Sequence, residues 1–274
     1  MGYIFRLNDI ERYEDELRSE QGRAVFALET GLLKKVWSPV SPQRVLQVGC
    51  GSGIFLDWFA SLGHCVTGLD PSGPSLELAR KNLSARVDLD RGFAEDLPYS
   101  DNEFDTVALI TSLEFVRDPG KALSEAARVA RRNILLGVLN RYSIGRVQYF
   151  LERFWKDSLY SNARFFSVFQ LRKMAFRTLA GQVPIEWRTC FFLPLPLLRY
   201  FHLLERCPVL QRFPFGHFIA MRIDLQNRLL TLQTPVFSEI PSGAANAASA
   251  RPLCRLSLCG DLHAGSRAPE QTED

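Results

Sequence analysis

A short apolar run ending in closely spaced glycines constrains this 274-residue chain more than any other feature. The run RVLQVG, residues 44–49, is rich in branched aliphatic side chains, which is typical of a strand buried in a parallel sheet. Gly49, Gly51 and Gly53 follow, and the segment IFLDWFASLG after them has helical periodicity. Glycine accepts positive φ and lets backbone amides approach a ligand with no Cβ in the way. The pattern therefore predicts a strand, a tight ligand-binding turn and a helix.

An aspartate at the end of the next apolar run adds a second constraint. The run CVTGLD, residues 65–70, is predicted to be a strand, and Asp70 closes it 21 positions after Gly49. A carboxylate in that place can accept hydrogen bonds from both hydroxyls of a ribose. A glycine turn alone would suit NAD equally well, but the spacing here is GxGxG rather than GxGxxG.

Predicted strands and helices alternate along most of the chain. Amphipathic periodicity predicts one or two helices over residues 8–36, a helix begun by Ser72 and another over 118–131. Apolar runs predict strands at 44–49, 65–70, 87–93, 104–110, 133–139, 187–193 and 217–224. This alternation predicts a three-layer α/β/α sandwich with a seven-stranded, mostly parallel, doubly wound sheet that binds ligand at the carboxyl ends of its strands.

Composition narrows the classes of protein that need consideration. The chain is 46% hydrophobic, and its net charge of +3 with a pI near 8.6 is too mild to call for a DNA partner. Six cysteines and four histidines form no metal-ligand spacing, so we expect no metal site. The charged N-terminus is unlike a signal peptide, and scattered cysteines suit a reducing compartment, which predicts a cytoplasmic protein. No apolar run reaches membrane-spanning length.

Three segments together carry a resemblance to a known family. VLQVGCGSG, GLDPS and AEDLPYSDNEFD, in this order and spacing, resemble motifs I, II and III of class I (Rossmann-like) S-adenosylmethionine (SAM)-dependent methyltransferases. The likeness is strongest to the ubiquinone/menaquinone-type small-molecule group and covers roughly residues 40–140. It implies SAM as the cofactor and a methyltransferase domain over residues 43–225, preceded by an N-terminal helical cover over 1–42.

The resemblance also implies roles for single residues around the methionine and ribose parts of SAM. Gly49, Gly51 and Gly53 would line these parts, together with Cys50, which we expect to be a packed side chain of the turn and not a nucleophile. Asp70 would hold the ribose hydroxyls. The residues expected to face the methionine and the methyl group follow the fourth strand: Thr111 and Ser112.

The adenine contacts implied by the resemblance include one departure. Pro71 would lie along the face of the adenine, and Ala94 and Glu95 would border its edge. Many relatives have an acidic residue just before this Ala-Glu pair, where the present chain has Phe93. Either Phe93 stacks on the base, or Glu95 or Asp96 replaces the missing acid.

Two later segments fall outside the motifs. Residues 141–182 are basic and aromatic and are predicted to form a helical insertion, either a plain cap or a lid over the site. Residues 141–206 are also the candidate for peripheral contact with a membrane. The tail, residues 233–274, is rich in Ala, Ser, Pro and Gly and is predicted to be disordered.

The predicted reaction is in-line displacement, in which an acceptor nucleophile attacks the sulfonium methyl group. Catalysis then rests mainly on proximity, alignment and exclusion of water, so no catalytic residue need appear as a motif. His202 and His217 are candidate general bases. The preferred acceptor is a small apolar, aromatic or lipid-like molecule. Alternatives are a catalytically silent scaffold, a nicotinamide-dependent oxidoreductase and an RNA or protein methyltransferase. The oligomeric state stays open.

Overall fold

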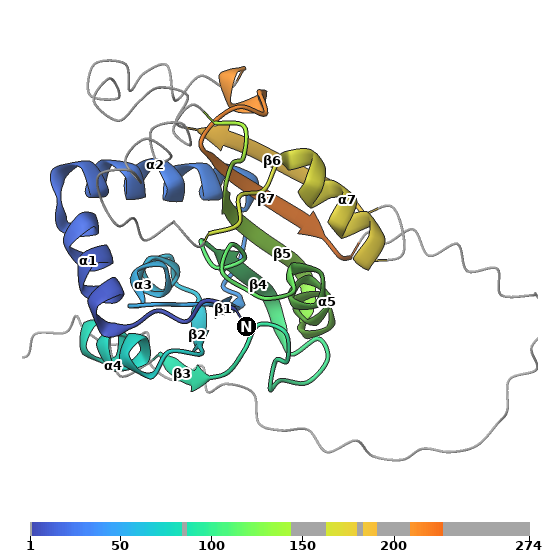
Figure 1. Ribbon diagram of the computed structural model, residues 1–274. Coiled ribbons are helices and arrows are strands. Elements are labelled where there is room, and N and C mark those ends of the chain that lie inside the picture. The colour runs from blue at the N-terminus through green and yellow to red at the C-terminus, as the bar shows by residue number, and fades with distance from the viewer. Residues whose placement is uncertain (1, 84–86, 144–162, 180–182, 191–208, 227–274) are drawn as a thin grey trace, which may run out of the picture. The chain divides into compact units, whose positions relative to one another are not determined.

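The computed structural model describes residues 2–83, 87–143, 163–179, 183–190 and 209–226. All of them belong to one compact unit, Met1–Leu230. The described strands join in one seven-stranded sheet of order β3-β2-β1-β4-β5-β7-β6 (Figure 1). In chain order they are β1 (Arg44–Val48), β2 (Cys65–Asp70), β3 (Asp88–Arg91), β4 (Phe104–Ile110), β5 (Ala130–Leu139), β6 (Ile185–Cys190) and β7 (Phe218–Asp224).

Only β7 runs against its neighbours, β5 and β6, while the remaining pairs are parallel. The chain leaves β1 toward β2 and β3 and then returns to β4 on the other side of β1. In open α/β sheets such a reversal leaves a crevice at the carboxyl ends of the two strands, where ligands bind. The topology therefore places the expected site beyond the ends of β1 and β4.

Helices cover both faces of the sheet (Figure 1). On one face α5 and α7 contribute to a cluster with Leu46, Leu109 and Leu136. On the other face α2 and α3 pack against Val45 and Ile110. The described helices are α1 (Leu7–Arg18), α2 (Glu20–Val36), α3 (Ile54–Ser61), α4 (Gly73–Asn82), α5 (Pro119–Val129), α7 (Val168–Thr178) and the 3-10 turn η2 (Leu210–Arg212).

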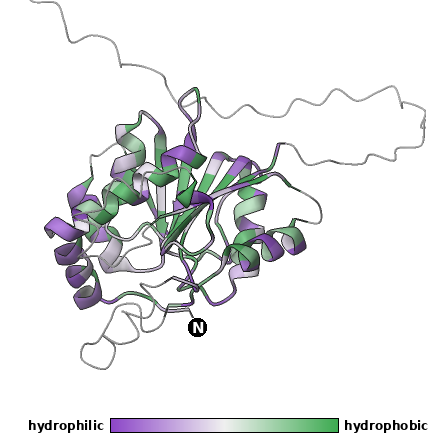
Figure 2. Cartoon of the chain, turned by 90° about the horizontal axis from the view of Figure 1, so that it is seen from above, coloured by the Kyte–Doolittle hydropathy of each residue, from purple (hydrophilic) through white to green (hydrophobic). Residues whose placement is uncertain are grey.

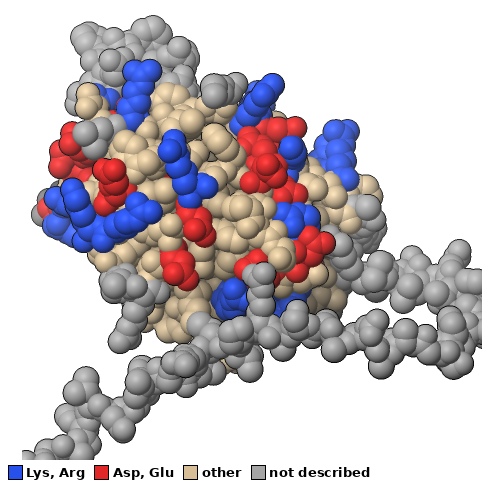
Figure 3. Space-filling model, turned by 90° about the horizontal axis from the view of Figure 1, so that it is seen from below, with Lys and Arg blue, Asp and Glu red and all other residues tan. Residues whose placement is uncertain are grey.

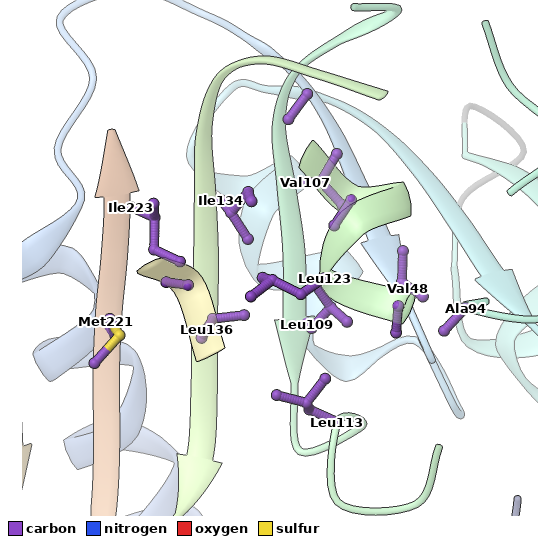
Figure 4. Packing of buried hydrophobic residues seen from close by; sticks show 14 of the residues in the cluster. Val48, Ala94, Val107, Leu109, Leu113, Leu123, Ile134, Leu136, Met221 and Ile223 are labelled. Carbon is purple, nitrogen blue, oxygen red and sulfur yellow. The ribbon is translucent and has the colours of Figure 1, made fainter. Parts of the chain in front are cut away.

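The alternation of side chains along the strands explains this layering. Successive side chains point to opposite faces, so a strand covered on both sides is apolar at most of its positions. All seven residues of β4 are buried. In Figure 4 Leu123 of α5 lies among Leu109 and Leu136 of the sheet. Figure 2 shows the same division, with green strands inside and purple residues on the outer sides of the helices. The predicted three-layer sandwich is confirmed.

Local capping explains where several helices begin. The side chain of Asp118 accepts hydrogen bonds from the amides of Gly120 and Lys121, and Pro119 occupies the first turn of α5. Ser72 caps α4, as its sequence position predicted. The boundary between α5 and β5 differs from the prediction, because the strand begins at Ala130 and not at residue 133. Ala130 pairs with Phe104 across a bulge, which ends the helix early and extends the strand.

Charged side chains of both signs are interspersed on the face drawn in Figure 3. None of the described helices is both long and apolar enough to span a membrane.

Several predictions concern residues that lie largely or wholly outside the described ones. Of the insertion 141–182, the structure describes α7 and the segment before it, where Phe166 bridges to Asn140 at the end of β5. Membrane contact through 141–206 and the division into domains stay predictions. The tail 233–274 and His202 lie outside the described residues altogether.

Candidate active site

A cavity of about 530 Å³ opens where the topology predicts a ligand site. Its volume falls within the usual range for small-molecule sites, about 300–1,000 Å³. Its walls are the glycine turn after β1, the end of β2, the loops after β3 and β4, and the N-terminal segment before α1. The site therefore combines five parts of the chain that are distant in sequence.

The glycine turn has the left-handed backbone that its sequence predicts. Gly49, Gly51 and Gly53 have φ values of 71°, 55° and 90°. The amides of Gly49 and Cys50 both donate to the carbonyl of Leu69, at 2.7 and 3.1 Å, which ties the turn to β2. A Cβ on Gly49 would overlap the side chain of Ser112, whereas a Cβ on Gly51 would meet nothing within 4 Å. The space in front of Gly51 is thus open to a ligand.

Asp70 holds the turn from the opposite side. One carboxylate oxygen accepts the amide of Gly51 at 2.9 Å, and the other accepts the amide of Ser72 at 2.9 Å. Burial raises the pKa of Asp70 above its ordinary value, and the two amide donors oppose this rise. An ionised carboxylate can accept about four hydrogen bonds, so two places remain for donors in the cavity.

Two buried polar atoms in the cavity wall have no protein partner among the described residues. Gln47 of β1 is 1% exposed and its Oε1 accepts no hydrogen bond, and Ser112 leaves its hydroxyl likewise without a partner. A buried polar atom without a partner is costly, so its presence in a cavity wall favours a polar ligand. The sequence reasoning missed Gln47, because one glutamine in an apolar strand carries no motif.

The loop after β3 contains the three candidates for the place of the missing acid. Phe93 lines the cavity with 53% of its surface exposed. Glu95 also lines it, but its Oε1 accepts the amides of Arg117 and Asp118, at 2.8 and 3.2 Å. Asp96 is absent from the cavity wall. The cavity wall thus contains both Phe93 and Glu95, and the exposure of Phe93 favours the stacking alternative.

Most of the predicted site residues come together in this cavity. Gly53 does not line it: it begins α3, and a Cβ there would lie 2.7 Å from Leu83. Cys50 is 4% exposed, and burial raises the pKa of its thiol, which suits a packed side chain. The predicted residues found in the wall are Gly49, Cys50, Gly51, Asp70, Pro71, Ala94, Glu95, Thr111 and Ser112.

His217 lies away from the cavity wall. Its Nδ1 is 2.8 Å from the hydroxyl of Ser143, and burial lowers its pKa to about 4. His217 lies next to the end of β5, where its backbone carbonyl accepts a hydrogen bond from the amide of Asn140. The described geometry therefore gives it no contact with a ligand in the cavity.

The N-terminal segment supplies a wall that the sequence reasoning missed. The amide of Tyr3 donates to the carbonyl of Phe115 at 2.9 Å, and the hydroxyl of Ser72 donates to the carbonyl of Phe5 at 2.9 Å. The rings of Phe5 and Phe115 pack edge to face with centroids 4.8 Å apart. Five residues without periodicity give no signal in sequence, and only the tertiary contacts reveal their place.

Helix α1 brings Tyr13 to the cavity opposite the end of β4. Burial raises the pKa of its hydroxyl, and the charge of Glu29 raises it further, while Thr111 opposes the rise. Thr111 has φ +48°, a left-handed conformation that is rare for a β-branched residue. Backbone strain of this kind is concentrated at functional sites.

Two carboxyl groups, Glu29 of α2 and Glu114 after β4, have raised pKa values. Burial raises the pKa of Glu114 to about 7. Burial, and then the charge of Glu114, raise the pKa of Glu29 to about 8. In the unfolded chain both groups would lose their protons near pH 4.5. Between pH 4.5 and their pKa values in the folded protein, the folded state binds more protons than the unfolded state. The contribution of the two groups to the free energy of unfolding therefore falls as the pH rises.

We therefore expect Glu29→Gln to stabilise the fold increasingly from pH 6 to pH 8. The gain should reach about 2 kcal/mol at the higher pH, after allowance for partial exposure of the side chain. Urea denaturation at the two pH values measures it. Glu77→Gln on exposed α4 is the matched control and should change neither value. An equal effect of Glu29→Gln at both pH values would contradict the raised pKa.

Fold and site together define an α/β protein that binds a small polar ligand at the carboxyl ends of a doubly wound sheet, in the manner of adenosyl-cofactor enzymes. Residues 46–136 match the family model described as a methyltransferase domain. Over 173 residues the chain is 30% identical to an uncharacterized protein of Methanocaldococcus jannaschii, covering 61% of this chain and 78% of that protein. The chain belongs to the class I SAM-dependent methyltransferases, enzymes whose cofactor is SAM.

Other relatives agree with this assignment at lower coverage. A ubiquinone biosynthesis O-methyltransferase of Thiobacillus denitrificans is 34% identical over 110 residues, which are 38% of this chain and 47% of that enzyme. The chain thus spans less than half the length of that relative. A SAM-dependent methyltransferase of Thermotoga maritima has the same fold, with a TM-score of 0.63, 24% identity, and coverage of 80% of this chain and 96% of that one.

Proposed function

We propose that the protein transfers the methyl group of SAM to a small acceptor with an apolar body, and that the cavity holds both. The carrying observation is the carboxylate of Asp70, fixed by the amide of Gly51 at 2.9 Å, beside open space in front of that glycine. Two remaining acceptor places on this carboxylate suit the two ribose hydroxyls. The orphan oxygen atoms of Gln47 and Ser112 would meet polar groups of the amino acid part.

Bound SAM supplies a methyl group on a positively charged sulfur, whose transfer leaves a neutral thioether. The chain's part in such a reaction is to bind, align and exclude water. Thr111 and Ser112 follow β4 directly, where the rigid, fully buried strand fixes their positions. Tyr13 and the N-terminal segment also line the cavity, and their proposed part is to keep water from the reacting groups.

The character of the cavity wall supports an acceptor with an apolar body. Apart from the polar groups already named, much of the wall consists of aliphatic and aromatic side chains, such as Ile10, Ile54, Phe55, Ile110 and Val116. An acceptor with an apolar body binds such a wall favourably, because binding removes apolar surface from water. The test is transfer of labelled methyl from SAM to a lipid extract and to a panel of small aromatic compounds. Absence of label in every hydrophobic fraction and every compound would contradict the proposal.

Phe93 is proposed to stack on the adenine. We expect Phe93→Ala to weaken binding of S-adenosylhomocysteine (SAH) about tenfold, because base–aromatic stacking contributes about 1–3 kcal/mol. Stability should change little, since Phe93 is 53% exposed. Titration calorimetry measures the affinity, and thermal unfolding without ligand is the control. Unchanged affinity would assign the adenine contact elsewhere.

We place the reaction in the cytoplasm. The support is the spacing of the six cysteines along the sequence, which suits a reducing compartment. Fractionation of cells that produce the tagged protein tests this location, and recovery in an oxidising compartment would contradict it.

A further inference from the structure

The outer face of α7 carries aromatic side chains that the core does not use. Val168, Leu171 and Ala175 are buried on its inner face, in the same cluster as residues of the sheet and of α5 (Figure 1). Phe169 and Phe176 lie on the opposite face and are 62% and 57% exposed. A helix that packs on one side usually has polar and charged residues on the other. Two exposed rings on one helix face therefore point to a contact surface.

Basic side chains flank the two rings. The α-helix has about 3.6 residues per turn, so Phe169 and Phe176 lie nearly in line along α7, two turns from one another. By the same geometry Arg172 lies on one side of this line, and Lys173 and Arg177 lie on the other. All three cations are exposed. We call these five residues the α7 surface.

The positive charge of the α7 surface is not balanced by acidic neighbours in sequence. The described segment 163–179 contains a fourth cation, Arg164, and no Asp or Glu. None of these four cations forms a salt bridge with another described residue. Helix α1 is different, because it contains residues of both signs and its Arg18 pairs with Glu14 at 3.0 Å. The α7 surface therefore attracts a negatively charged partner.

An anionic membrane surface matches both the rings and the charge. In helices that lie on membranes, aromatic side chains enter the boundary between headgroups and acyl chains, while Lys and Arg remain among the headgroups. Anionic lipids attract each Lys or Arg that comes close to the surface. A single-stranded nucleic acid would also match the charge, but proteins bind it in a groove that follows its backbone. The exposed side of a helix is convex and offers a flat lipid surface the better fit.

The N-terminal end of α7 lies at the edge of the sheet where the cavity opens. Just before the helix, the amide of Phe166 donates to the carbonyl of Leu139 at the end of β5, at 3.1 Å. The amide of Arg164 donates to the carbonyl of Glu114 at 2.9 Å, in the loop that also lines the cavity with Ser112. A protein bound to a membrane through α7 would thus keep this edge of the sheet close to the lipids.

We infer that the α7 surface binds the surface of an anionic lipid bilayer. The inner face of α7 stays packed on the sheet, so only Phe169 and Phe176 enter the lipid and the helix need not leave the fold. This inference goes beyond the proposed function and does not depend on it, because none of the five residues lines the cavity.

The test is cosedimentation of the full chain with two kinds of lipid vesicle. One kind is phosphatidylcholine alone, and in the other about a third of the lipid is phosphatidylserine. We expect binding to the anionic vesicles to be about tenfold or more tighter, because the three cations of the α7 surface are attracted to their headgroups. Added salt should weaken this binding, since it screens exposed charges.

Two sets of variants separate the rings from the charge. Phe169→Ser combined with Phe176→Ser should weaken binding to the anionic vesicles about tenfold or more, because apolar surface no longer enters the lipid. Arg172→Gln, Lys173→Gln and Arg177→Gln together should remove the preference for anionic lipid. All five side chains are exposed, so thermal unfolding should show both variants folded.

The matched control removes two cations from a different helix. Arg80→Gln with Lys81→Gln, at exposed positions in the last turn of α4, should leave vesicle binding within about twofold of the parent value. Equal binding to the two kinds of vesicle, or binding to neither, would overturn the inference. Anionic vesicle binding that survives both α7 variants would overturn it too. So would binding of single-stranded RNA through the α7 surface by a protein that leaves the vesicles in the supernatant.

Discussion

Replacement of Asp70 by asparagine should weaken binding of SAH about 100-fold. The asparagine side chain offers one acceptor oxygen where the carboxylate offers two, so its amide group must face the amide of Gly51 or that of Ser72. The variant therefore loses a charge-assisted bond that shapes the turn and an acceptor for the ribose. Together these contribute about 2–3 kcal/mol, which corresponds to about two decades in affinity. Titration calorimetry with SAH gives the affinity directly.

The same substitution at an exposed aspartate provides the control. Asp57→Asn removes one negative charge from an exposed residue in the first turn of α3. It should leave the affinity for SAH within about twofold of the parent value. Burial raises the pKa of Asp70, so its removal need not lower stability, and unfolding curves without ligand should show both variants folded. Full affinity of Asp70→Asn for SAH would refute the role assigned to this carboxylate.

Gly49→Ala and Gly51→Ala should have different consequences although both glycines have positive φ. At position 49 the new methyl would overlap Ser112, so the turn must shift and the fold should lose about 3 kcal/mol or more. At position 51 the methyl meets no protein atom, and the cost should be about 1 kcal/mol of backbone strain. It would enter the cavity, however, and should lower the affinity for SAH about tenfold or more.

Chemical denaturation and SAH titration of the two variants separate these effects. Gly49→Ala should shift the denaturation midpoint more than Gly51→Ala does. Gly51→Ala should weaken SAH binding by more than its small loss of stability would explain. Ser112→Gly in the Gly49→Ala background removes the overlapping side chain and should restore part of the stability. Equal destabilisation by the two alanines would contradict the close approach of the turn to Ser112.

The sequence predicted the fold well because its signals are local. Buried parallel strands are continuous apolar runs, and Ser72 precedes its helix as a capping residue should. The doubly wound arrangement also follows, since a chain of alternating strands and helices has few allowed topologies. The start of β5 was misplaced because the pairing of Ala130 with Phe104 across a bulge is a tertiary contact with no local signature.

The site was predicted where a motif marks it and missed where distant segments meet. The glycine turn and Asp70 follow two neighbouring strands, β1 and β2, so their geometry follows from one strand–turn–helix–strand unit. Tyr13 and Phe5 come from the N-terminal part, and nothing in the local sequence shows which of its residues will face a cavity formed by later strands. Gly53 was assigned to the ligand by its place in the motif, but it packs against Leu83.

The structure of the protein with SAH bound tests the central claim most directly. We predict the ribose hydroxyls at the carboxylate of Asp70, the adenine against Phe93, and the sulfur near Thr111 and Ser112, facing Tyr13. A complex in which SAH lies outside this cavity, or in which Asp70 contacts no part of the ribose, would contradict the account.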